Sequence, residues 1–62
     1  MIKREFFVVI VDNSTRAVKS IEARCDSVDN ANMFIEENAY LMKETTNQNC
    51  SFKINEVVVI EG

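Results

Sequence analysis

The sequence predicts a small α+β fold with the element order β-β-α-β, in which a three-stranded antiparallel sheet carries one helix on one face. Six consecutive large apolar residues, 6–11, predict a strand that is apolar on both faces, because alternate side chains of a strand point to opposite faces. Apolar residues at helical spacing between Val28 and Met42 predict one amphipathic helix. A strand that is apolar on both faces belongs at the centre, so the expected spatial order is 2-1-3.

The first two strands are expected over residues 3–11 and 16–25 and form a hairpin. The turn between them, at residues 12–15, has the sequence DNST, whose side chains bond their own backbone and tolerate left-handed conformations. A tight turn at these four residues places Val9 opposite Val18.

The helix follows directly, since Asp26 and Ser27 are both competent N-caps. We expect about seventeen helical residues, with Lys43 in the last turn. Asn47 or Asn49 is expected to take the left-handed position that ends the helical segment. The third strand is expected over residues 51–60. The apolar stripe of the helix consists of Val28, Ala31, Phe34, Ile35, Asn38, Ala39, Leu41 and Met42.

Alternation in the three strands assigns two apolar faces to the sheet. The face expected beneath the helix collects Phe6, Val8, Ile10, Ala17, Ile21, Ala23, Phe52, Ile54, Val58 and Ile60. The opposite face collects Phe7, Val9, Val11, Val18, Val57 and Val59.

A chain of 62 residues has no further element to cover this second face, which is apolar at its centre and charged at its rim. That arrangement is typical of a protein interface, so its six residues are the candidate partner-binding residues. The alternative is that the face is wet, as in many antiparallel sheets, and that its valines reflect strand preference.

A second candidate surface lies on the helix, on the side away from the apolar stripe. Met33 and Tyr40 lie there among the carboxylates of Glu36 and Glu37, and Met and Tyr are enriched at interfaces. The alternative is an ordinary solvated helix face.

Composition bounds the possible functions. The chain is expected to form one domain, 1–62, close to the lower size limit for folding alone. The net charge of −3 divides into +2 over residues 1–25 and −5 over residues 26–62. An acidic second half argues against direct binding of nucleic acid. No signal peptide or membrane-spanning run is visible, so we expect a cytoplasmic protein without membrane contact.

The amino acids that are absent argue against an enzyme. The sequence has no His, and its only Gly is Gly62, so it offers no imidazole base and no phosphate-binding glycine loop. Two cysteines cannot complete a zinc site without His. We therefore expect no catalysis, no metal and no cofactor.

The two cysteines test the topology, because Cys25 ends the second strand and Cys50 precedes the third. A helix that runs back along the sheet places them at opposite ends, too far apart for a disulfide.

Several stretches resemble the Dmd family of T-even phage antitoxins. They are "NS" in the turn (Asn13-Ser14), "KSI" in the second strand (19–21), "DSVDNA" at the start of the helix (26–31) and the C-terminal Gly62. The resemblance implies a phage protein in the host cytoplasm that binds and blocks an mRNA endoribonuclease toxin of the RnlA or LsoA type. No binding residue is transferred from the family. The alternative function is a homodimeric structural or regulatory module without a nuclease target.

Overall fold

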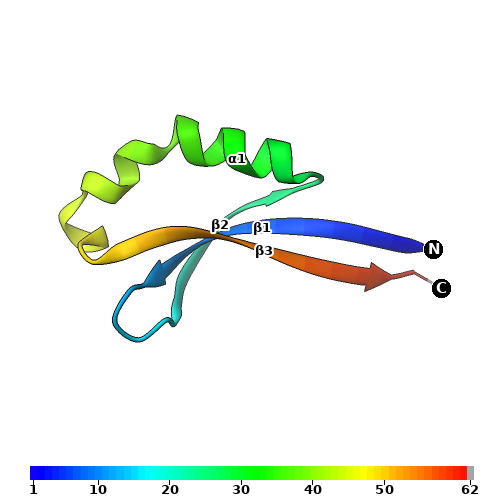
Figure 1. Cartoon of the computed structure of the whole chain (residues 1–62), viewed down its shortest axis with the longest axis horizontal. Helices are drawn as coiled ribbons and strands as arrows, with labels where there is room; N and C mark the ends of the chain where they lie inside the picture. The colour runs from blue at the N-terminus through cyan, green and yellow to red at the C-terminus, as the bar shows by residue number, and fades with distance from the viewer. Residues whose placement is uncertain (62) are drawn as a thin grey trace.

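The computed structural model describes residues 1–61 and confirms the predicted α+β fold (Figure 1). The sheet is antiparallel with strand order β2-β1-β3, and the helix lies along one side of it. Gly62, part of the family resemblance, lies outside the described residues. The elements are β1 (Ile2–Asp12), β2 (Val18–Cys25), α1 (Val28–Glu37), the 3₁₀ helices η1 (Ala39–Lys43) and η2 (Thr45–Asn47), and β3 (Cys50–Ile60).

The hairpin between β1 and β2 is longer than the tight turn expected from the sequence. The backbone carbonyl of Asp12 accepts the N–H of Arg16 at 2.8 Å, and the Asp12 N–H donates to the carbonyl of Ala17 at 2.9 Å. The Asp12 carboxylate also accepts the N–H groups of Ser14 and Thr15, at 2.7 and 3.1 Å. The left-handed residue of the turn is Arg16, with φ of 66°.

The longer turn makes the predicted register of the first two strands wrong. Val9 lies opposite Ile21, not Val18, and Val18 lies opposite Val11. Two irregularities in the pairing shift the register further, one between Ile10 and Val11 and one between Val8 and Val9. Each inserts an extra residue into β2, as a β-bulge does. Ala17, expected beneath the helix, lies outside the strands and is exposed.

The helix is also shorter than predicted, because α1 ends at Glu37 and gives way to 3₁₀ turns. The Asn38 side chain donates to the carbonyl of Phe34 at 2.9 Å, and its backbone N–H donates to the same oxygen at 3.0 Å. Asn side chains compete for backbone partners in this way, which explains why the apolar periodicity continued while the helix did not. The N-terminus follows expectation, since Ser27 Oγ accepts the N–H of Asn30 at 3.1 Å.

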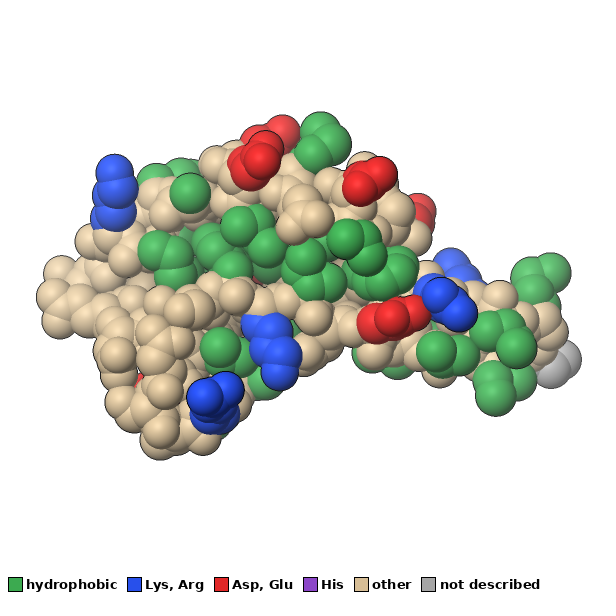
Figure 2. All heavy atoms as spheres, in the orientation of Figure 1, with side chains coloured by type: hydrophobic (Ala, Val, Ile, Leu, Met, Phe, Trp, Pro, Cys, Tyr) green, Lys and Arg blue, Asp and Glu red, His purple; other side chains and the backbone are tan. Residues whose placement is uncertain are grey.

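The buried core is small and lies beneath α1. Val8 and Ile10 of β1 and Ala31 of α1 are buried on the helix side of the sheet. Beyond this core β1 and β3 continue as a two-stranded ribbon, because β2 ends opposite Phe6. The ribbon projects to the right in Figures 1 and 2 and carries the start of β1 and the end of β3 at its tip. The radius of gyration is 12.7 Å, which is larger than the radius of ~10.6 Å expected for a compact chain of this length.

The predicted positions of the cysteines are confirmed. Cys25 lies opposite Phe6 and Cys50 lies opposite Asp12, so six residues of β1 separate them. That spacing corresponds to ~20 Å, well beyond the ~7 Å that a disulfide permits between Cα atoms. Both thiols are free. Asn49 takes the expected left-handed conformation just before β3, with φ of 63°.

Candidate protein-binding face

The side of the sheet that faces away from α1 is here called the open face. Residues directly opposite in antiparallel strands share a face, so the pairing of β1 with both neighbours defines it. From β1 it carries Lys3, Glu5, Phe7, Val9 and Val11; from β2, Val18, Ile21 and Arg24; and from β3, Ser51, Lys53, Asn55, Val57 and Val59.

All six candidate residues predicted from the sequence lie on the open face, but they do not form one patch. A shallow apolar hollow of about 260 Å³ brings four of them together: Phe7, Val9, Val18 and Val57, with Ile21 and Asn55 completing its lining. Val11 lines a different hollow near the hairpin. Val59 lies farther out, on the two-stranded ribbon opposite Lys3.

Burial separates the floor of the apolar hollow from its rim. Val9 is only 2% exposed and forms the floor. Val18, Ile21 and Val57 are 52%, 65% and 40% exposed, so the rim supplies the surface that another molecule can contact. Burying exposed apolar side chains is the main favourable term in most protein association.

Ile21 is the residue of this hollow that the sequence interpretation assigned to the wrong face. A strict alternation from Val18 would place it beneath the helix, but the bulge brings it opposite Val9. Strict alternation from Val18 would also place Lys19 in the row beneath the helix, and a lysine at such a position indicates a changed register. In the structure Lys19 is exposed, and its ammonium donates to the carbonyl of Thr46 in η2.

The hairpin end of the open face is held by hydrogen bonds to the segment that precedes β3. The Asn13 N–H donates to the carbonyl of Asn49 at 2.8 Å, and Asn49 Nδ2 donates to Ser14 Oγ at 2.6 Å. Ser51 Oγ donates to Asn13 Oδ1 at 2.8 Å. These bonds fix the turn beside β3, so that Arg16 from the turn and Lys53 from β3 line one hollow.

The second candidate surface, on the helix, is interrupted. Met33, Glu36 and Glu37 lie on α1 and are exposed, whereas Tyr40 lies on η1, beyond the break at Asn38. The spacing of seven residues between Met33 and Tyr40 therefore does not correspond to two turns of one α-helix.

Comparison of the chain with protein-family models, with curated proteins and with solved structures found no match. Within residues 1–61, no group of three or more His, Cys, Asp or Glu side chains is placed to hold a metal ion. None of the helices within residues 1–61 has the length and hydrophobicity that a membrane span requires.

Proposed function

We propose that this chain is a phage-type antitoxin, acting in the host cytoplasm, which binds a host mRNA endoribonuclease toxin and blocks it by occlusion. The proposal joins the resemblance to the Dmd antitoxins with one structural observation, the apolar hollow on the open face. Its rim exposes Val18, Ile21 and Val57 around a buried floor. An apolar centre surrounded by charged side chains suits a protein partner.

The extent of exposed surface supports a binding role. The chain has an accessible surface of 4603 Å² for a mass of 7.1 kDa, whereas a folded monomer of this mass is expected to expose about 4100 Å². The excess, roughly 500 Å², is spread over the molecule, and the exposed apolar side chains lie on the ribbon as well as on the open face. The lack of His in the sequence also favours binding over catalysis.

The proposal is tested by adding the chain to a purified toxin of the RnlA or LsoA type and measuring RNA cleavage. Toxin activity is expected to fall linearly with added protein up to an equivalence point, as occlusion by a tight binder requires. Loss of activity at substoichiometric amounts, increasing with time, would indicate catalysis. Unchanged cleavage at excess protein would rule out this toxin class as the target.

Two matched variants identify the face that binds. Ile21→Asp changes the rim of the open face, and Met33→Asp changes the exposed surface of α1. Inhibition is expected to be lost in Ile21→Asp and kept in Met33→Asp. The reverse result would assign binding to the helix surface.

A homodimeric module remains the second candidate function, and the two-stranded ribbon favours it. Ile2 and Ile60 lie opposite each other there, next to Val58, and all three are exposed on the helix side of the sheet. The open face does not use these residues. Sedimentation of the free chain tests this function: a dimer that Val58→Asp converts to monomer would support it.

A further inference from the structure

The open face is positively charged, although the chain as a whole carries −3. Arg24 lies opposite Phe7, Lys53 lies opposite Val9, and Arg16 lines the hollow next to Lys53. Among residues 1–61, none of these three cations takes part in an ion pair. Among the other strand residues assigned to this face, the charged ones are Lys3 and Glu5, which lie 3.9 Å apart and offset each other.

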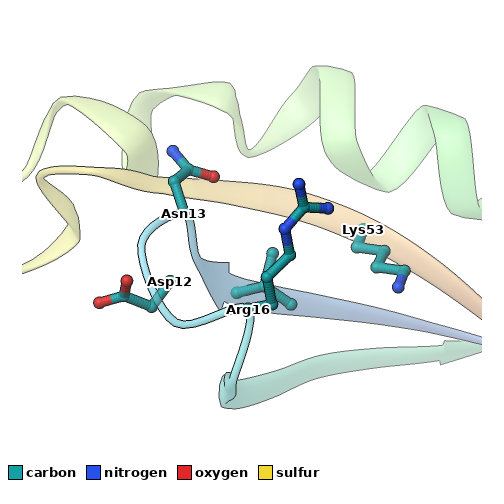
Figure 3. Close-up of a pocket in the computed structure, with 5 residues that line it drawn as sticks. Asp12, Asn13, Arg16 and Lys53 are labelled. Atoms are coloured by element: carbon teal, nitrogen blue, oxygen red, sulfur yellow. The ribbon is translucent and has the colours of Figure 1, made fainter.

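Arg16 and Lys53 line a hollow of about 380 Å³ at the hairpin end of this face, together with Val11, Asp12 and Asn13. Figure 3 shows Arg16 and Lys53 reaching this hollow from the turn and from β3, with their charged ends apart and the Asp12 carboxylate turned away from them. That carboxylate already accepts the N–H groups of Ser14 and Thr15. The hollow therefore offers two positive groups to an incoming anion.

The opposite surface of the molecule is acidic. Exposed carboxylates follow one another along α1 and the segment after it, at Asp29, Glu36, Glu37 and Glu44. In Figure 2 acidic side chains lie along the helix, whereas Lys and Arg side chains lie mainly over the strands below it. The net charge of the chain does not reveal this separation of positive and negative charge between two surfaces. A partner responds to the local electrostatic potential of the face that it contacts.

We propose that the open face binds an acidic protein surface, in which a carboxylate lies between Arg16 and Lys53 while an apolar side chain enters the neighbouring hollow at Val18, Ile21 and Val57. This inference rests on the proposed function and specifies the chemistry of the partner. The apolar hollow contributes buried area, and the cations contribute orientation and association rate.

A second copy of the chain fits this face poorly. Two open faces stacked about a two-fold axis bring the cations of one copy towards those of the other, and like charges across an interface are unfavourable. The acidic helix of a second copy has the right charge, but it lies on the opposite side of the sheet. Such a head-to-tail contact leaves the open face of one copy and the acidic helix of the other free to bind further copies. It therefore extends into an open filament.

The test is an NMR titration of the ¹⁵N-labelled full chain with an acetylated, amidated hexapeptide of alternating leucine and glutamate. Amide shifts are expected at Arg16, Lys53 and the apolar rim, with affinity falling about tenfold or more between 0.05 and 0.5 M salt, because screening weakens exposed charge pairs. The matched peptide with lysine in place of glutamate, and hexauridylate, serve as competing probes.

Charge reversal locates the binding group. The double variant Arg16→Glu, Lys53→Glu is expected to bind the acidic hexapeptide at least tenfold more weakly, and Lys43→Glu on η1 is the control with unchanged binding. Lys53→Glu alone, within a regular strand, keeps the test valid if the altered turn fails to fold. Equal binding of the lysine peptide, tighter binding of hexauridylate, or self-association that the double variant abolishes would each overturn the proposal.

The toxin assay separates this inference from the proposed function. If the wild-type chain inhibits the toxin and the folded double variant inhibits equally well, the acidic partner surface is wrong while the antitoxin function stands. If the acidic hexapeptide binds as expected but the toxin is unaffected, the antitoxin function fails and the chemistry of the face stands.

Discussion

The two faces of β1 are nearly equal in apolar content, yet they are covered by different means. On the helix side Val8 is fully buried beneath a second layer that includes Ala31. On the open face Val9 is almost as buried, at 2% exposed, with no helix above it. Ile21 and Lys53 lie directly opposite it on the adjacent strands, and Phe7, Val18 and Val57 line the same hollow. A small sheet can therefore bury the centre of a face and still expose an apolar rim.

The largest effect is expected on the helix side. Val8→Asp buries a charge without a partner, which costs several kcal/mol. A core of this size rarely supplies more than ~3–5 kcal/mol of net stability. The variant is therefore expected to be unfolded at 25 °C by circular dichroism. Ile21→Asp, on the exposed rim, is the matched control and is expected to keep the fold. If Val8→Asp folds, the two faces are not covered as described.

A second pair of variants tests the floor of the open face. Val9→Ala removes two methyl groups from a buried site and is expected to destabilise the chain by about 2 kcal/mol in urea unfolding, close to the effect of Val8→Ala. A decrease in the free energy of unfolding below ~0.5 kcal/mol for Val9→Ala, with the full decrease for Val8→Ala, would indicate that the rim leaves Val9 open to water.

The helix side depends in addition on its N-cap. Ser27→Ala removes the acceptor of the Asn30 N–H and is expected to cost about 1 kcal/mol. Asp26→Ala is the control, because Asp26 is the neighbouring competent cap that the helix does not use. Urea denaturation of both variants measures the difference. Equal losses would indicate that the two residues share the cap.

Those elements that depend on local pattern were predictable. The doubly apolar run of β1 and the polar residues of the turn were enough to predict the sheet order and the position of the open face. The register of β2 was not predictable, because it depends on how Arg16 and Ala17 close the turn and on two bulges within β2. The end of α1 was missed because Asn38 has a helical position in the apolar stripe and a competing side-chain bond to Phe34.

The sequence predicted a charged rim for the open face, but not that its cations outnumber its carboxylates. The sequence shows a surplus of cations in its first half, but Lys53 comes from the acidic second half and joins Arg16 only through the β1–β3 pairing and the hairpin turn. A sum over the chain cannot reveal which charges share a face.

The smallest expected effect concerns Arg16, which occupies a left-handed conformation with φ of 66°. That conformation disfavours residues other than Gly by roughly 1–2 kcal/mol, and the greater chain entropy of Gly cancels about 0.5–1 kcal/mol of the difference. Arg16→Gly is therefore expected to stabilise the fold by about 0.5 kcal/mol in urea unfolding, while it weakens the binding of the acidic hexapeptide.

Asn49→Gly, at the other left-handed position, is expected to destabilise the fold instead, because Asn49 Nδ2 donates to Ser14 Oγ. Opposite signs for these two variants would show that Arg16 is kept for binding at a cost in stability. A destabilised Arg16→Gly with unchanged binding would show that the arginine serves the fold.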